Sequence, residues 1–535
     1  MNLPNVGDRI SYSGHLGTIK FIGNVDNTPG TWLGVEWDEP ERGKHDGVKD
    51  GKRYFSCRIP NAGSFIRPSV NVIRGVSFLA ALQSKYIEAF HGTSSQEKVT
   101  LGSSNGVIEV EAVNLDKIRG KFANLERLRE VSLENELVAR ADTPGLIMET
   151  CPNIRGLNLS TSLLPSWLTV ADIAVELPAL QTLSLNRNRL QIPPNPGKMT
   201  SAFLGVTSLE LNGTLTTWQE MQYIVSFMPK LLAVELGYNN ISRMADNEHS
   251  TSPKCHITAL NLDSNYIKDW KDLSCALSHY HHLERLVLTS NKIESIPSLE
   301  EHPPLGGLKY LSLTSNLLRQ WKDIDTLALW CPALISLSLN GNPMTQHDWS
   351  DEARHARAFT IARIPSLKIL DSTTITSKER TDCELFYLSW ISQHFTFDGD
   401  PESVAYKTAL IREHPRWEEL CKRHGTPTTT NLRSSDRQDN LSSKLIEIQI
   451  LLVLGSSPSK DDIGEMVITR ILPTMTLKML RAKTRKQLKC SKNANISLWL
   501  KMNDGSWNKL DTERDQQEVD WLGLENGSQL ACCIH

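Results

Sequence analysis

A run of five residues near the amino end has the composition of a peptide-binding loop. It reads Gly43, Lys44, His45, Asp46 and Gly47. Glycine has no Cβ, so a bound peptide can approach the backbone at both ends of the run. The lysine can pair with a carboxylate, and the two residues after it offer hydrogen-bond donors and acceptors. These residue types predict the capture of an acidic peptide, which is a binding function and not a reaction.

Aromatic residues and a second cation flank this run. Trp32 and Trp37 precede it, and Phe65 and Arg67 follow it. The rings can enclose the ring of a ligand, and the arginine can meet a carboxylate, including a terminal one. Residues 1–75 contain ten Lys and Arg against eight Asp and Glu, whereas the whole chain has a formal net charge of -3. The local sign therefore suits an acidic peptide.

The segment that carries these residues is predicted to be a small antiparallel β-barrel. Residues 17–23 and 32–37 alternate as strands do, and turn residues recur every eight to ten positions. Some rings must fill the core of so small a module. Trp37 and Phe55 therefore have two interpretations, as core or as walls of the binding surface.

The motif and its flanks resemble the CAP-Gly family. The resemblance rests on residues 32–38, 43–47, 54–57 and 63–67, and it covers about the whole of residues 1–75. The family core is usually Gly-Lys-Asn-Asp-Gly, and here His45 takes the asparagine position. The family binds acidic tails that end in an aromatic residue, as on α-tubulin. The resemblance thus implies an α-tubulin tail site made of Trp32, Trp37, Gly43, Lys44, His45, Asp46, Gly47, Phe65 and Arg67.

An apolar frame of the form L-x-x-L-x-L-x-x-N recurs from residue 128 onward. Its copies begin 25 or 26 residues apart until a last step of 33. This period indicates leucine-rich repeats, in which the L-x-L core forms a short parallel strand on the concave face. The asparagine is expected to bond backbone groups where the chain turns inward. Between the leucines, the candidate contact residues on the concave strands include Glu210, Glu235, Asn261, Val287 and Ser312.

The carboxyl-terminal segment has a different pattern. Residues 424–440 are polar and typical of a linker. Residues 444–450, 466–472, 496–500 and 527–532 resemble strands, and Thr476 predicts the N-cap of a helix between the second and third. This element order resembles the ubiquitin-like fold. The chain ends without Gly-Gly, which predicts a docking module and not a conjugated tag.

The chain, at 535 residues, is too long for one hydrophobic core. We expect a multidomain protein with an all-β CAP-Gly barrel, an α/β leucine-rich-repeat solenoid and an α+β ubiquitin-like (β-grasp) domain. The predicted segments are a CAP-Gly domain at 1–75, a helical connector at 76–100, a solenoid with its carboxyl-terminal cap at 101–395, a connector and polar linker at 396–440, and a ubiquitin-like domain at 441–535.

Composition excludes several classes of protein. Hydrophobic residues make up 39% and charged residues 22% of the chain, which gives no reason to expect a nucleic-acid or membrane-surface protein. No stretch approaches the roughly 18 uncharged apolar residues that a membrane helix needs. The ten cysteines form no Cys-x-x-Cys pair, which favours a reducing compartment. We expect a cytoplasmic protein.

Three motifs that could support catalysis or metal binding lack the context for it. Residues 102–106 match G-x-S-x-G, but a strand-like run follows where a helix is needed. Residues 47–53 resemble a phosphate loop with one spacer residue too few. His279, His281 and His282 have no Cys or carboxylate at ligand spacing. We expect no catalytic residue, no metal and no cofactor.

The ordered combination of the three modules resembles the tubulin-specific chaperone E (tubulin-folding cofactor E) family. The resemblance implies a cytoskeleton-associated α-tubulin chaperone that works with tubulin-folding cofactors B, D and C in assembling or dismantling the αβ heterodimer. The ubiquitin-like module would dock another cofactor or the proteasome. Two alternatives stay open: a microtubule-end CAP-Gly adaptor, although no long heptads are visible, and a ubiquitin-pathway adaptor. An enzyme is the weakest alternative.

Overall fold

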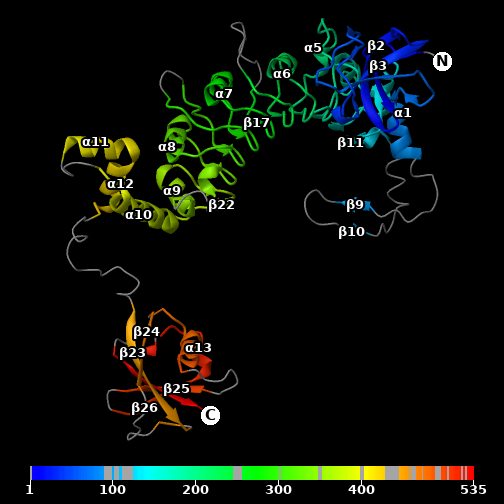
Figure 1. The fold of residues 1–535 in the computed structure, drawn as a ribbon. Helices are drawn as coiled ribbons and strands as arrows, with labels where there is room; N and C mark the ends of the chain where they lie inside the picture. Colours follow the sequence, from blue (N-terminus) through cyan, green and yellow to red (C-terminus); the bar gives the residue numbers. More distant parts are fainter. Residues whose placement is uncertain are drawn as a thin grey trace. The chain divides into compact units, whose positions relative to one another are not determined.

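The chain divides into two compact units, Met1–Thr426 and Pro427–His535 (Figure 1). The computed structural model describes residues 3–88, 99–101, 108–110, 125–244, 256–299, 303–346, 352–397, 403–427, 445–455, 457–458, 466–472, 474–488, 496–502, 505–519, 522–524 and 527–534. The G-x-S-x-G run at residues 102–106 and most of the predicted polar linker lie outside the described residues.

Five antiparallel strands form the sheet of the amino-terminal module, in the order β6-β3-β2-β1-β7. Successive side chains of a strand point to opposite faces of the sheet, so every second residue of each strand faces the core. This core contains Ile10, Ile19, Leu33, Val35 and Trp37. The strands are β1 (Arg9–Tyr12), β2 (His15–Asn24), β3 (Thr31–Trp37), β6 (Gly63–Ile66) and β7 (Val72–Ile73), with a separate hairpin of β4 (Val48–Lys49) and β5 (Lys52–Arg53).

A short connector joins this module to the solenoid. β8 (Val76–Ser77) pairs in parallel with β12 (Val138–Arg140), and α1 (Phe78–Gln83) follows it with its apolar side chains in the solenoid core. Farther along, the Arg189 guanidinium lies 3.5 Å from the Asp38 carbonyl, and Arg58 pairs with Glu220 at 3.5 Å. The barrel therefore contacts the first repeats directly. Beyond α1, β9 (Val99–Leu101) and β10 (Ile108–Val110) pair with each other.

Strands of two or three residues form the spine of the solenoid, and neighbouring repeats pair in parallel in strict register, as Leu183 does with Leu209. The central residue of each three-residue strand is buried and its two neighbours face the concave side. This arrangement confirms the predicted leucine-rich repeats. In order the strands are β11 (Glu130–Ser132), β13 (Gly156–Asn158), β14 (Thr182–Ser184), β15 (Ser208–Glu210), β16 (Ala233–Glu235), β17 (Ala259–Asn261), β18 (Arg285–Val287), β19 (Tyr310–Ser312), β20 (Ser336–Ser338), β21 (Ile369–Leu370) and the antiparallel β22 (Thr373–Thr374).

The repeat asparagines bond the backbone at each inward turn, as expected. Asn265 is representative: its Oδ1 accepts from the N–H groups of Asn239 and Ile241, both at 3.0 Å. Its Nδ2 donates to the carbonyls of Leu236 at 2.9 Å and Leu262 at 3.0 Å. One buried side chain thus pairs backbone groups from two repeats, which would otherwise be buried without partners.

Helices line the convex side, and three of them begin with a fully buried tryptophan, at Trp167, Trp218 and Trp270. Side-chain caps fix two of these starts, because Thr217 and Asp269 accept hydrogen bonds from the first helical turns. The convex elements are α3 (Leu146–Thr150), α4 (Trp167–Ala174), α5 (Met199–Ala202), α6 (Trp218–Val225), α7 (Trp270–Leu277) and α8 (Trp321–Trp330).

A four-helix cap closes the solenoid, and it extends past residue 395. It consists of α9 (Ala356–Arg363), α10 (Ser377–His394), α11 (Val404–Glu413) and α12 (Trp417–His424). Leu410 and Leu420, from the predicted connector, are buried in one cluster with Phe359, Tyr387 and Ile391. The apolar residues of 404–424 thus belong to the core of the cap, and the polar segment begins only after them.

The buried His414 in this cap gives its stability a pH dependence. Burial, aided by the nearby Arg363, lowers the pKa of His414 from 6.5 to about 4. Between these values the unfolded chain binds a proton and the native cap does not, so we expect stability to fall as pH falls from 6.5 to 4, by up to about 3 kcal/mol. Hydrogen exchange of residues 377–394 at pH 7 and pH 5 would measure this loss of stability. His414→Phe should remove this dependence, and a parallel loss in the variant would contradict the prediction.

The second unit is a mixed five-stranded sheet with one helix. The strand order is β24-β23-β27-β25-β26. β23 is parallel to β27, and the remaining three neighbouring pairs are antiparallel. Leu477 and Leu480 of the helix pack on Ile448, Leu498 and Leu530 of the sheet. The four predicted strands and the helix are present, and β26 had no clear sequence signal. The elements are β23 (Ile446–Leu454), β24 (Met466–Ile471), α13 (Leu477–Gln487), β25 (Ile496–Lys501), β26 (Trp507–Leu510) and β27 (Gln529–Ile534).

Candidate functional site

The loop at residues 43–47 is held against the sheet by its glycines. A Cβ on Gly43 would lie 2.0 Å from the Asn61 carbonyl oxygen, and one on Gly47, at φ +93°, would lie 2.2 Å from that of Phe55. Gly63 bonds the loop on both sides, since its N–H donates to His45 at 2.7 Å and its carbonyl accepts from Lys44 at 2.8 Å. The glycines therefore serve packing within the module, in addition to any access they give a ligand.

His45 takes a defined role in this loop. The Gly47 N–H donates to its Nδ1 at 3.0 Å, so Nδ1 accepts and the neutral ring carries its proton on Nε2. Burial lowers the pKa of His45, and the Lys44 charge acts in the same direction against Asp46. The ring centre lies 5.0 Å from that of Phe65. A neutral imidazole thus supplies the acceptor within the loop, with its proton on Nε2.

An aromatic cluster adjoins the loop. Phe65 lies at its centre, with ring centres 5.4 Å from Phe55, 5.6 Å from Tyr54 and 6.2 Å from Phe21. Phe55 is buried beneath the others, whereas Phe21, Tyr54 and Phe65 are half-buried. Sequence reasoning had not assigned Phe21 or Tyr54 to the site. Phe21 joins this face through strand pairing, because it stands opposite Gly34, which in turn stands opposite Phe65.

Strand parity adds Trp32 and Arg67 to this face. Trp32 lies two residues before Gly34 on β3, and Arg67 two residues after Phe65. The Arg67 guanidinium stacks 3.8 Å from the Trp32 ring centre, and the indole N–H donates to Thr28 at 2.8 Å. This contact combines an aromatic surface and a cation within one pair.

The position of Trp37 on β3 directs its side chain away from the site. It lies on the same side of β3 as Leu33 and Val35, in the core, and only 2% of it is exposed. The guanidinium of Arg42 covers its ring at 4.4 Å. The assignment of Trp37 to the tail site is therefore wrong, and its core interpretation holds, because a ring sealed on both sides cannot flank a ligand.

The two charged residues of the loop differ in their environment. Asp46 pairs with Arg53 at 2.9 Å, and this bond lowers the pKa of the aspartate. Lys44 is exposed, and no carboxylate of the described chain pairs with it. The aspartate is thus already engaged, while the ammonium group is available to an incoming anion.

The packing of Gly47 predicts a stability effect with a matched control. Gly47→Ala should lower the free energy of unfolding of the barrel by about 1–3 kcal/mol from the strained φ alone, and further because of the contact with Phe55. Gly51→Ala is the control, since Gly51 has φ +79° but nothing within 4 Å of a Cβ. Thermal unfolding followed by circular dichroism compares them, and equal losses would contradict the packing role.

The concave face of the solenoid is a second candidate surface. The five predicted residues all lie at the last position of consecutive strands, half-buried on this face. Two carboxylates are held in place, Glu210 by Asn186 at 2.9 Å and Glu235 by Asn212 at 2.8 Å. A hollow of about 490 Å³ lies beside them, and Tyr238 on its wall is 62% exposed. Tyr238 was not singled out from the sequence.

Among the described residues, no group of three or more His, Cys, Asp and Glu side chains is placed to hold a metal ion. The His282 ring instead stacks on that of His256, with ring centres 4.5 Å apart. None of the helices in this part of the chain is long and apolar enough to cross a membrane.

Known proteins match both the amino-terminal module and the whole chain. The CAP-Gly domain model matches residues 6–70. Tubulin-specific chaperone E of Bos taurus is 33% identical over 541 residues, and that of Homo sapiens 32% over 542, each match covering 98% of this chain and 98% of the relative. Tubulin-folding cofactor E of Arabidopsis thaliana is 28% identical over 471 residues, 85% of both chains. The similarity therefore extends far beyond the barrel.

Proposed function

Because this chain belongs to the tubulin-specific chaperone E family, we propose that it is a tubulin-folding cofactor that binds α-tubulin without catalysing a reaction. The observation that carries the tubulin role is the end-to-end similarity, which leaves no module of the relatives unmatched. We further propose that it acts with cofactors B, D and C in assembling or dismantling the αβ heterodimer. We place it in the cytoplasm, in association with the cytoskeleton.

The aromatic face of the barrel is the proposed site for the acidic tail of α-tubulin. The Lys44 ammonium pairs with a tail carboxylate, because no carboxylate of the described chain competes for it. The rings of Phe21, Tyr54 and Phe65 receive the terminal aromatic residue. The Arg67–Trp32 pair, on the same face, meets further carboxylates.

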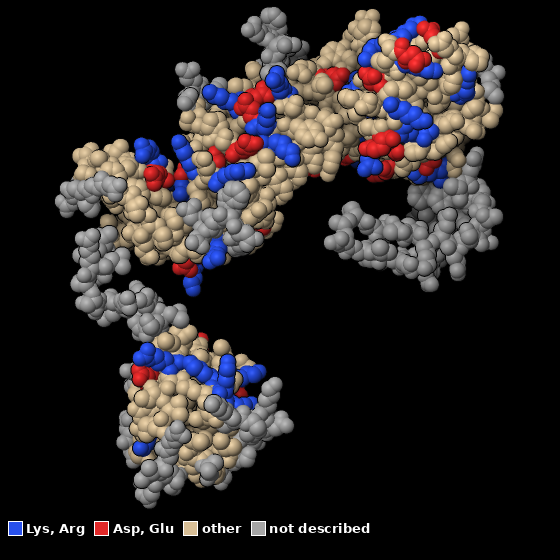
Figure 2. All heavy atoms as spheres, viewed as in Figure 1, with Lys and Arg blue, Asp and Glu red and all other residues tan. Residues whose placement is uncertain are grey.

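The solenoid and the second unit provide further binding surfaces. Lys and Arg alternate with Asp and Glu over the visible face of the first unit (Figure 2), so recognition of the tubulin body depends on local contacts. The concave face, with its held carboxylates and exposed Tyr238, supplies them. Two weak sites on one chain gain by effective concentration, which suits a chaperone that must hold and later release. The second unit, as a ubiquitin-like domain, docks another cofactor or the proteasome.

A binding experiment with the full chain tests the tail site. We expect an α-tubulin tail peptide to bind, and the same peptide without its terminal aromatic residue to bind about tenfold more weakly, as calorimetry would measure. Equal affinity for both peptides would overturn the aromatic part of the site. A soluble complex with unpolymerised α-tubulin supports the chaperone, whereas binding to polymer alone, seen by co-sedimentation, would support a microtubule adaptor.

A further inference from the structure

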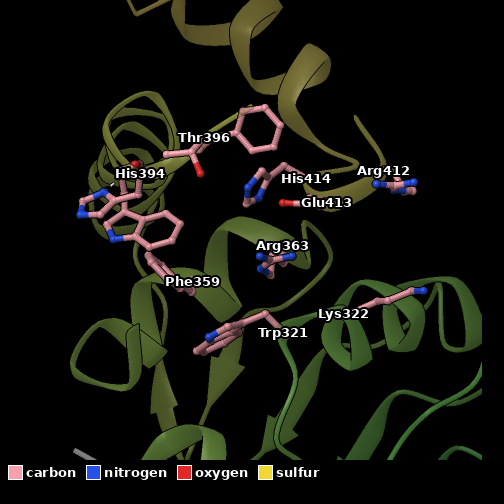
Figure 3. A pocket seen from close by; sticks show the side chains of 11 residues that line it. Trp321, Lys322, Phe359, Arg363, His394, Thr396, Arg412, Glu413 and His414 are labelled. Atoms are coloured by element: carbon pink, nitrogen blue, oxygen red, sulfur yellow. Dashed lines mark hydrogen bonds between the residues drawn. The ribbon is translucent and has the colours of Figure 1, made fainter. Parts of the chain in front are cut away.

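A cavity of about 520 Å³ lies in the carboxyl-terminal cap, where α8, α9, α10 and the end of α11 meet (Figure 3). This volume is in the range of sites that hold small ligands or single side chains of a partner. No role assigned above to the barrel, to the concave face or to the second unit uses it. The residues that line it are Trp321, Lys322, Phe359, Arg363, Trp390, His394, Phe395, Thr396, Arg412, Glu413 and His414.

Aromatic rings make up much of the wall. The Phe359 ring centre lies 5.3 Å from that of Trp321 and 4.9 Å from that of Trp390, both edge to face. Phe395 adds a fourth ring from the turn after α10. Trp321 and Trp390 are only half-buried, so their free surfaces can contact a planar group.

A buried cation lies within these rings. The Arg363 side chain is 5% exposed, and Figure 3 shows it between Trp321 and His414. Its Nη1 bonds the Asp325 carboxylate, but its Nε–H is buried without a hydrogen-bond partner. His414 bonds Tyr387 through Nδ1 at 2.9 Å, and no described residue bonds its Nε2. A buried donor without a partner is costly, and an acceptor atom in the cavity would relieve that cost.

The rim has an excess of positive charge. Lys322 and Arg412 are both exposed and lie on the same side of the cavity in Figure 3. Glu413 is the one carboxylate among the lining residues, and Asp325 balances Arg363 from outside the lining. The chemistry therefore favours a ligand that brings an anion, with its aromatic part against the rings.

We propose that this cavity binds an aromatic carboxylate, that is, an aromatic group with a carboxylate beside it, presented by a peptide segment or as a free acid. The aromatic group packs between Trp321 and Trp390. The carboxylate lies toward Arg363 and is attracted by Lys322 and Arg412 at the rim.

Fluorine NMR on the full chain tests the proposal, with the Lys44→Glu substitution present throughout to weaken binding at the barrel. One probe is a capped tripeptide of glutamate, 5-fluorotryptophan and glutamate, and the other is N-acetyl-5-fluorotryptophan. A capped tripeptide with glutamine in place of glutamate serves as the uncharged probe. The variants are Lys322→Glu and Arg412→Glu, both at exposed positions. Lys407→Glu is the matched control, because it makes the same charge change on α11 away from the lining.

We expect at least one anionic probe to bind, each rim variant to weaken it by about tenfold, and Lys407→Glu to leave it unchanged. Binding of the tripeptide alone identifies a peptide segment as the ligand, and binding of the N-acetyl acid identifies a free acid. The proposal is overturned if neither binds, if the glutamine probe binds as tightly, or if Lys407→Glu weakens binding as much as Arg412→Glu.

Discussion

Lys44→Glu should weaken binding of an α-tubulin tail peptide to the full chain by about ten- to hundredfold, which corresponds to about 1.4–2.8 kcal/mol. Lys44 is exposed and has no paired carboxylate in the described chain, so reversal removes an attraction and adds a repulsion to the acidic tail. The contacts of its backbone with Gly63 do not depend on the side chain. The fold of the loop should therefore survive the substitution.

Two variants separate a specific contact from a change of net charge. Lys44→Arg keeps the cation and should retain most of the affinity. Lys368→Glu makes the same charge change at an exposed position of the solenoid and should have no effect at moderate salt, where distant charges are screened. Calorimetric titration measures all three. Unchanged affinity of the Lys44→Glu protein for the tail peptide would contradict the proposed tail site. Binding of the tubulin body by the concave face should persist in this variant.

Glu384→Ala should cost the helical cap about 3–5 kcal/mol. The Glu384 side chain is 1% exposed and lies among cations. Arg423 Nη1 contacts its two oxygens at 3.1 and 3.2 Å, and His424 Nε2 lies 2.7 Å away. Arg416 is 3.7 Å from the same carboxylate. Removing the carboxylate takes a partner from the little-exposed side chains of Arg416 and His424 and from the half-exposed Arg423. α12 then loses its main polar attachment to α10.

Glu419→Ala provides the contrast. Glu419 also pairs with Arg416 and Arg423, at 2.6 and 2.9 Å, but its side chain is 48% exposed. Solvent screening limits such a pair to about 1 kcal/mol or less. Urea unfolding, with hydrogen exchange of residues 377–424 to localise the effect, would rank the two. A comparable loss for both variants would show that burial of Glu384 is not what fixes the cap.

The sequence predicted well wherever a short local pattern decides the structure. Successive leucine frames gave the register of the repeats, because the spacing of apolar residues determines which strand positions turn inward. The asparagine at the end of each frame bonds the backbone of the same turn and of the previous repeat, as Asn265 does. Thr476 capped the helix of the second unit, since an N-cap acts within one turn.

The composition of the binding face needed the pairing of strands. Trp32 and Trp37 occur in one strand of the same motif, yet one faces the site and the other the core, because their positions on β3 differ in parity. Phe21 joins the face only through its place opposite Gly34. Lys44 and Asp46 are both charged loop residues, and only the folded chain shows that Arg53 engages the aspartate.

The linear sequence therefore determined the modules, their order and most of their strands and helices, since these follow from periodicity and from residues a few positions apart. The tertiary structure alone decided which side chains are buried, paired or available, as it did for Trp37, for Leu410 and Leu420 in the cap, and for the Arg363 cavity. The physical reason is that burial and charge pairing depend on residues far apart in the chain, which only the packing of sheets and helices brings together.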